Sequence, residues 1–85
     1  MSKYQSQRSK GIKFLFKFDE VAPDLLHIYA RHLTTPRDAI AAYFEGKTEW
    51  NEQFQRYETC SESHCLYWFW LEKDKTVMVV SCFNV

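Results

Sequence analysis

The chain has few of the residues that make flexible linkers, with only two glycines and two prolines among its 85 residues. Hydrophobic residues make up 46% of it and aromatic residues 18%, which excludes a disordered tail and predicts an ordered globular chain. No apolar run comes near the ~20 residues that a transmembrane helix needs. The start, "MSKYQSQRSK", lacks the apolar segment of a secretory signal. We therefore expect a cytoplasmic protein with no membrane partner.

Cysteine is scarce and odd in number, at Cys60, Cys65 and Cys82. Secreted scaffolds of this size usually carry an even set, so we predict three reduced thiols. The stretch "CSESHC" suggests zinc at first sight, but His64 and Cys65 are adjacent and no second pair of ligands appears elsewhere. We interpret this stretch as a loop that leads into a strand, and we expect no metal ion and no cofactor.

Net charge is absent as well, because eleven Lys and Arg balance eleven Asp and Glu. A neutral balance argues against an obligate nucleic-acid binder, whose domain is more often strongly basic. The charges are unevenly distributed, however: residues 1–17 carry five cations and no acid, while residues 18–85 carry six cations and eleven acids. We expect residues 1–10 to form a flexible basic arm and residues 11–85 to form one domain. The arm is either a phosphate-binding element or a solvated tail.

Hydrophobic periodicity predicts the elements of this domain. The stretch "GIKFLFKF" alternates as a strand does, and "DEVAPDLLHIYARHL" repeats its apolar residues at helical spacing. A second helix should begin at Thr35 or Pro36 and end near Glu45, because Thr35 can cap it, Asp38 suits its first turn and Gly46 follows its end. Three strands follow in "EWNEQFQRYET", "CLYWFWLEK" and "TVMVVSCF". The predicted fold is α+β, in the order β-α-α-β-β-β, with two helices packed on a mainly antiparallel four-stranded sheet.

The last two strands carry apolar residues on both faces, but two helices can cover only one face of a sheet. We therefore expect at least one of Tyr67, Trp68, Phe69 and Trp70 to line a groove or an interface.

A charged pair, Arg31 and His32, ends the first predicted helix, where cations suit the helix dipole. A second polar group, Arg56 and Glu58, lies in the strand that should pair with the aromatic one. Cleavage of RNA through its own 2′-hydroxyl needs a base, an acid and fixed positive charge on the phosphorane-like transition state. These four residues are candidates for those roles, and the bland alternative is that Arg31 and His32 merely finish a helix.

Exposed aromatic side chains can stack on unpaired bases, and lysines can hold phosphates. The candidates for binding RNA or a partner are Tyr57, Tyr67, Trp68, Trp70, Lys13 and Lys17.

The element order, together with "ARHLTTPRDAIAAYF", resembles the small RelE-like and BrnT-like ribonuclease toxins of bacteria over residues 12–83. In the BrnT-like group a first helix ends in a basic residue plus His, a short turn follows, and a second helix has an acidic early turn. Those positions are here Arg31 and His32, residues 33–36, and Asp38. The resemblance implies RNA cleavage without a cofactor, on free RNA or on the ribosome, and a cognate antitoxin.

Three functions of different classes are open at this point. One is a metal-independent ribonuclease toxin of the toxin–antitoxin or polymorphic-toxin type. Another is a noncatalytic binding module, such as an immunity protein, an antitoxin partner or a phage-encoded inhibitor. A structural or assembly domain is a third.

Overall fold

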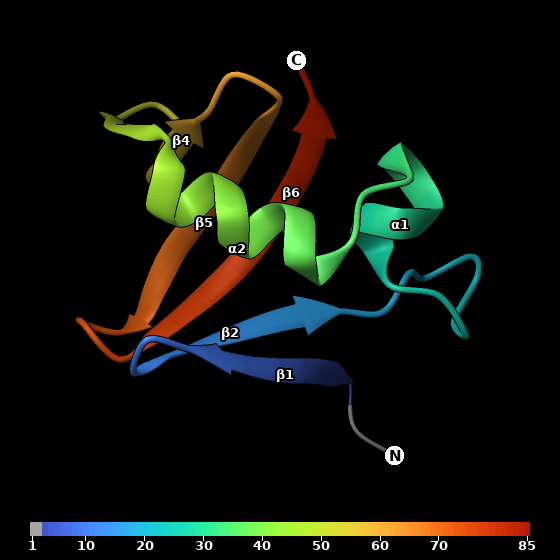
Figure 1. Ribbon diagram of the computed structural model, residues 1–85. Helices are drawn as coiled ribbons and strands as arrows, with labels where there is room; N and C mark the ends of the chain where they lie inside the picture. Colours follow the sequence, from blue (N-terminus) through green and yellow to red (C-terminus); the bar gives the residue numbers. More distant parts are fainter. Residues whose placement is uncertain (1–2) are drawn as a thin grey trace.

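The computed structural model describes residues 3–85 and contains one six-stranded sheet with two helices (Figure 1). The elements are β1 (Tyr4–Ser9), β2 (Ile12–Lys17), α1 (His27–His32), α2 (Pro36–Glu45), β3 (Lys47–Asn51), β4 (Arg56–Cys60), β5 (His64–Glu72) and β6 (Thr76–Asn84). The strand order is β1-β2-β6-β5-β4-β3. All neighbouring strands are antiparallel except β2 and β6, which are parallel.

The predicted count of four strands is wrong, although the α+β class holds. One extra strand, β1, comes from the segment predicted as an arm, of which residues 1 and 2 lie outside the described residues. It pairs with β2 through a two-residue turn in which Lys10 and Gly11 both have positive φ, the turn type that suits hairpins. Because β1 is a polar edge strand with almost every residue exposed, it has no hydrophobic alternation to reveal it.

The other extra strand arises because "EWNEQFQRYET" forms a hairpin of β3 and β4 rather than one strand. Its turn contains Gln55 at positive φ, and the Asn51 side-chain oxygen accepts a hydrogen bond from the backbone N–H of Phe54. Neither glycine nor proline occupies this turn, so the usual sequence signal of a break is missing.

The first helix is also shorter than the sequence predicts, because α1 begins only at His27. The preceding residues form a loop that is closed at its base by a bridge between Phe18 and Leu26. The backbone N–H groups of Val21 and Ala22 donate to the Asp19 carboxylate, which offers this stretch an alternative to helical hydrogen bonds.

The second helix, in contrast, is confirmed from Pro36 to Glu45. The Thr35 hydroxyl accepts a hydrogen bond from the Asp38 N–H at 3.2 Å, and the Asp38 carboxylate accepts one from the Thr35 N–H at 2.9 Å. This reciprocal capping box explains why the sequence signal was strong.

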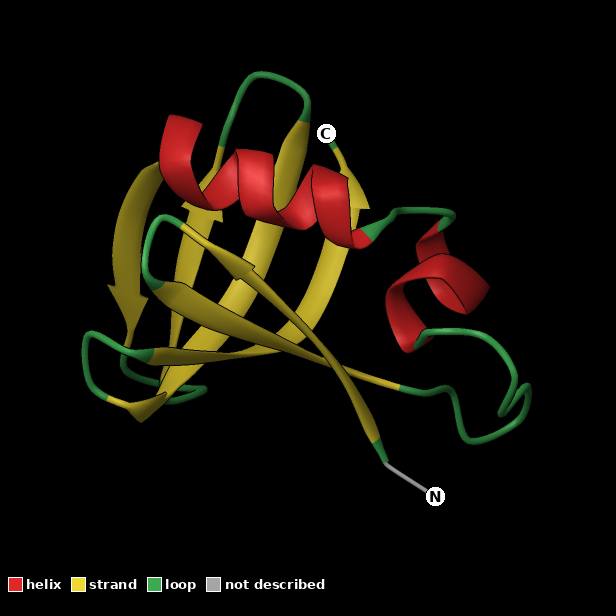
Figure 2. Ribbon diagram, turned by 60° about the horizontal axis from the view of Figure 1, so that its bottom comes forward, coloured by secondary structure: helices red, strands yellow, loops and turns green. Residues whose placement is uncertain are grey.

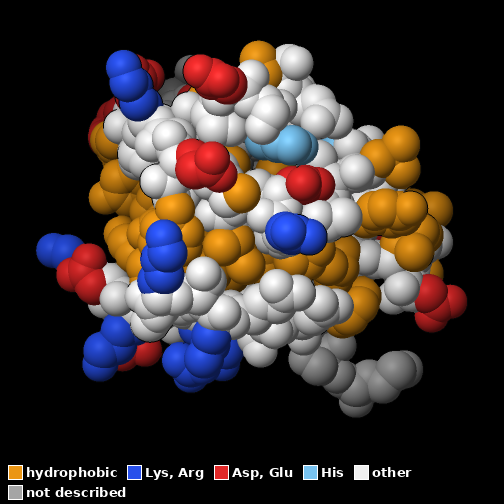
Figure 3. All heavy atoms as spheres, viewed as in Figure 1, with side chains coloured by type: hydrophobic (Ala, Val, Ile, Leu, Met, Phe, Trp, Pro, Cys, Tyr) orange, Lys and Arg blue, Asp and Glu red, His pale blue; other side chains and the backbone are white. Residues whose placement is uncertain are grey.

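Both helices contribute to one core on a single side of the sheet (Figures 1 and 2). Helix α2 lies across β5 and β4, and α1 packs against β6 and β2. The core consists of Phe14, Phe16, Ile28, Ala39, Ala42, Leu66, Trp68, Val77, Val79 and Cys82. Seen from the α2 side, charged side chains of both signs stand among hydrophobic ones (Figure 3). Neither helix within residues 3–85 has the length and apolarity that crossing a membrane requires.

Cys60 and Cys65 form a disulfide, whereas the sequence analysis predicted reduced thiols. The two residues are directly opposite each other on β4 and β5, so the pairing of the strands brings the sulfur atoms together. The pairing depends on the register of β4 and β5, which the number of cysteines in the sequence does not reveal. Cys82 remains a free, buried thiol.

The cap of α2 gives a first test. Replacing Thr35 with Ala removes the acceptor for the Asp38 N–H, and we expect it to lower the free energy of unfolding by about 1 kcal/mol. Thr35→Ser keeps the hydroxyl and should change it by only a few tenths. Urea unfolding followed by circular dichroism measures both; equal losses for the two variants would show that the hydroxyl is not the cap.

The end of α1 gives a second test. Leu33 has a φ of 56° and its side chain is 74% exposed, so it bears the cost of a left-handed backbone and gains little from burial. Because that conformation costs an L-residue ~1–2 kcal/mol, Leu33→Gly should raise the unfolding free energy by about 0.5–1 kcal/mol. Leu33→Ala retains the Cβ and should bring no gain in the same urea titration.

Candidate functional site

The side of the sheet that faces away from both helices is the uncovered face. Leu15, Met78 and Phe69 lie side by side at its centre, on three neighbouring strands. All three are half-buried, although no helix within residues 3–85 lies over them. A half-buried apolar sheet face of this kind is typical of a binding surface.

A row of rings and one guanidinium in contact with one another runs along one end of the uncovered face. The ring of His32, at the end of α1, lies 5.8 Å from the ring of Phe83 on β6. The Phe83 ring lies 5.1 Å from that of Tyr67 on β5, and the guanidinium carbon of Arg56 on β4 lies 3.9 Å from the Tyr67 ring. We call His32, Phe83, Tyr67 and Arg56 the ring row. Three rings and one planar cation thus follow one another from α1 to β4.

Arg56 is held firmly within this row. Its guanidinium lies between two rings, with Phe54 at 4.6 Å and Tyr67 at 3.9 Å. Its Nε donates to Glu58 at 3.0 Å, and the Asn51 amide donates to the same carboxylate oxygen at 2.9 Å. The terminal amino groups of Arg56 have no acceptor within residues 3–85, so they can donate to a ligand from a fixed position.

The four predicted catalytic residues fall into separate places. Arg56 and Glu58 come together, but as an ion pair. Phe83 and Tyr67 stand between His32 and Arg56. Two rings therefore separate the imidazole of His32 from the guanidinium of Arg56.

Arg31 has a structural role instead. Its Nε donates to the Asp19 carboxylate at 3.0 Å, and the Nδ1 of His27 lies 3.2 Å from the same oxygen. These contacts tie α1 to the loop before it. The pKa of Asp19 is lowered to about 2, and the largest cause is the hydrogen bond from the backbone N–H of Ala22. Burial opposes this shift, while the backbone N–H of Val21 and the side chains of His27 and Arg31 lower the pKa further. Asp19 thus remains ionised at neutral pH as the anchor of this corner.

The predicted stacking residues divide between the two faces. Tyr67 lies on the uncovered face, whereas Tyr57, Trp68 and Trp70 lie on the helix side. Trp68 is only 3% exposed and is stacked against Tyr57 with ring centres 4.7 Å apart. Among Tyr67, Trp68, Phe69 and Trp70, only Trp68 is buried, so the four side chains are not all enclosed within this domain.

Three cations of β1 and β2, Arg8, Lys13 and Lys17, lie on the uncovered face along its β1 edge. We call residues 3–17 the basic hairpin, because they carry Lys3, Arg8, Lys10, Lys13 and Lys17 and no acid. Arg8 lies directly opposite Lys13, and Lys17 lies opposite Tyr4. Within residues 3–85, no carboxylate forms an ion pair with any of these five cations. Like charges directly opposite each other destabilise a sheet, and this pair faces solvent uncompensated.

Sequence reasoning missed three members of this surface. Arg8 was assigned to the flexible arm, and Phe54 and Phe83 were not singled out. Alternation along "TVMVVSCF" would not have placed Phe83, because the pairing of β5 with β6 shifts register between Tyr67 and Trp68. Phe54 lies in the unrecognised turn between β3 and β4.

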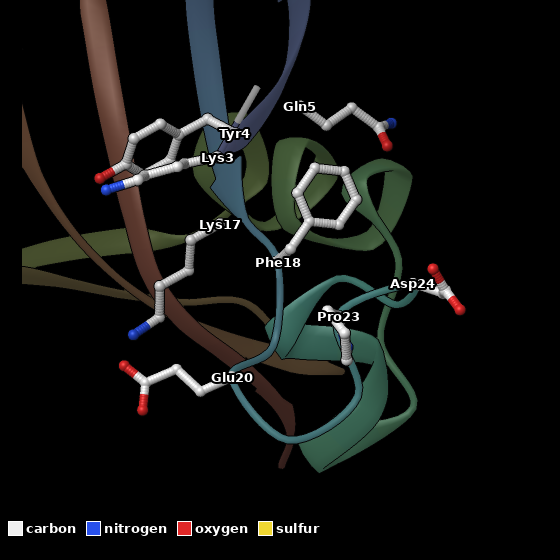
Figure 4. A pocket seen from close by; sticks show the side chains of 8 residues that line it. All are labelled: Lys3, Tyr4, Gln5, Lys17, Phe18, Glu20, Pro23 and Asp24. Atoms are coloured by element: carbon white, nitrogen blue, oxygen red, sulfur yellow. The ribbon is translucent and has the colours of Figure 1, made fainter. Parts of the chain in front are cut away.

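A hollow of about 970 Å³ lies at the open end of the basic hairpin (Figure 4). The side chains of Lys3, Tyr4 and Lys17 lie on one side of the chain there, and the Phe18 ring lies on the other. Glu20 and Asp24 also line it, so charges of both signs border the hollow. This mixture indicates no single class of ligand.

Comparisons with protein-family models, with curated proteins and with solved structures found no match to this chain. A proposed function therefore has to come from the residues described above.

The Asp19 anchor predicts an acid-sensitive corner. Because its pKa in the folded protein is about 2, below the ordinary 3.8, its contribution to stability is complete above pH ~4 and is lost as the pH falls towards 2. We expect the melting temperature of the wild type to fall more steeply over this range than that of Asp19→Asn. Asp24→Asn, a change at an exposed aspartate of the same loop, should keep the wild-type slope; parallel curves for all three proteins would contradict the prediction.

Proposed function

We propose that this protein binds single-stranded RNA on its uncovered face, with phosphates on the basic hairpin and bases against the ring row. The observation that carries the proposal is the uncompensated charge of β1 and β2 on the same sheet face as the rings of Tyr67 and Phe83. Cations without carboxylate partners attract a polyanion, and half-buried rings offer flat surfaces for unpaired bases.

The spacing of the two parts suits one extended strand. Lys17 lies at the end of β2, and Tyr67 lies on β5, with only β6 between them. Strands in a sheet are ~4.8 Å apart, so the two strands are separated by ~10 Å. A backbone that follows the hairpin can therefore direct its bases towards the rings.

Arg56 adds a fixed donor to this surface. Its ring contacts and its bond to Glu58 orient the guanidinium before any ligand arrives. A side chain that is already ordered loses less entropy on binding, and a guanidinium forms paired hydrogen bonds with phosphate or base edges.

Cleavage needs more than this surface supplies. A proton-transfer group and a cation must meet at one phosphate, whereas His32 and Arg56 are separated by two rings and Arg56 is paired with Glu58. The proposal therefore concerns RNA binding rather than a ribonuclease toxin. An RNA ligand would place the protein in the cytoplasm.

Salt dependence tests the hairpin. In fluorescence anisotropy with a labelled oligouridine of about 12 nucleotides, within the range of single-domain site sizes, we expect binding that weakens with salt. The double change Lys13→Gln and Lys17→Gln removes two phosphate contacts and should reduce the slope of log K against log salt by about 1.4.

The matched control is Lys47→Gln with Lys73→Gln, which removes the same charge outside the hairpin. If both double variants lower the salt slope equally, the hairpin acts only through the net charge of the protein and not through direct phosphate contacts. Equally tight binding of oligodeoxythymidine would extend the ligand to DNA, and equally tight binding of heparin would replace the RNA proposal with a general polyanion site. Incubation of the RNA in EDTA tests for cleavage in the same samples.

The rings give an independent test. Tyr67→Leu removes a stacking surface, and we expect a loss of RNA affinity equivalent to about 1–3 kcal/mol per stacked base. Tyr57→Leu changes the same residue type on the helix side and should leave affinity unchanged once both variants are shown to be folded. A loss confined to Tyr57→Leu would contradict the placement of the ligand on the uncovered face.

A further inference from the structure

A groove of about 650 Å³ lies on the other side of the basic hairpin, between β1 and α2. Three cations border it: Arg8 and Lys10 from the hairpin and Arg37 from α2. Ile40 and Phe44 provide apolar surface along α2, and Glu45 is the one carboxylate among the lining residues that the structure describes.

The cations of this groove have no acidic partner within the described part of the protein. None of the three forms an ion pair with a carboxylate of residues 3–85, Glu45 included. The Lys10 amine lies 4.6 Å from the centre of the Phe44 ring, so a charge is held over an aromatic surface. In Figure 3, which views the molecule from this side, Lys and Arg side chains border hydrophobic surface.

The turn of the hairpin connects this groove to the uncovered face. Lys10 and Gly11 form that turn, and a Cβ placed on Gly11 would meet no atom within 4 Å. The space beside the turn is therefore open. Arg8 lies opposite Lys13 on the uncovered face and also borders the groove, so a line of cations continues around the hairpin.

We infer that the same single strand of RNA passes over the Lys10–Gly11 turn and continues into the groove between β1 and α2, where Arg37 contacts its backbone. Charge complementarity identifies the occupant, because three cations without acidic partners border an open groove with an apolar floor. This inference rests on the proposed RNA binding and adds a second segment to its path.

Oligonucleotide length separates the two segments. Oligouridines of about 5 and about 12 nucleotides cover the lower and upper part of the range seen for single-domain sites. The short one should bind the uncovered face alone, and the long one should reach the groove as well. We expect the long RNA to bind the wild type more tightly and with a steeper salt slope.

Arg37→Gln should reduce the salt slope for the long RNA by about 0.7, the value of one phosphate contact on a single strand, and leave the short RNA unaffected. Lys47→Gln removes one charge from β3, at the opposite edge of the sheet from β1, and should change neither. Circular dichroism checks that both variants are folded.

An equal effect of Arg37→Gln and Lys47→Gln on the long RNA, or no effect of Arg37→Gln, would overturn the groove segment while the short-RNA result still supports the proposed function. Absence of wild-type binding at either length would overturn both. A loss with Arg37→Gln at both lengths would place the groove in the primary site and contradict the two-segment path.

Discussion

The parallel pairing of β2 with β6 is the contact on which the rest of the structure depends. It joins residues 13–16 to residues 76–79, nearly the two ends of the chain. Phe14 lies beside Val77 and Phe16 beside Val79, and all four side chains are almost completely buried. Burial of such side chains contributes about 1.5–3 kcal/mol each, which offsets the entropy lost in closing so long a loop. Without this pairing, the basic hairpin would have no fixed relation to the rings.

The pairing also explains how a chain with no net charge presents a basic surface. The five cations of the hairpin lie along one edge of the sheet, and no carboxylate of residues 3–85 forms an ion pair with them. Glu58 lies on β4, the strand that carries Arg56, but its carboxylate accepts hydrogen bonds from Arg56 and Asn51. The net charge of the whole chain therefore does not describe the surface at β1 and β2, because the local electrostatic field depends on which charges lie near one another.

Arg31 and His32 are adjacent in the sequence but have different surroundings. Arg31 is bound to Asp19 and helps hold the corner that leads into α1. His32 reaches the ring of Phe83 instead, because α1 packs beside the part of β6 that extends past the end of β2. The buried Thr34 hydroxyl completes this junction by donating to the Cys82 carbonyl at 2.7 Å. The pair lies at the end of α1, and His32 also extends the ring row.

The sequence by itself determined the elements whose signals are local. The alternation of Phe14 and Phe16 was enough for β2, and the reciprocal hydrogen bonds of Thr35 and Asp38 lie within four residues, so α2 could be placed accurately. Only the tertiary structure decided the edge strands, the ring row and the anchor at Asp19. Polar edge strands lack a hydrophobic period, and stacking and ion pairing depend on distances between residues far apart in the chain. The candidate surface was therefore visible in the sequence as residue types, but its geometry came from the register of β2, β6 and β5.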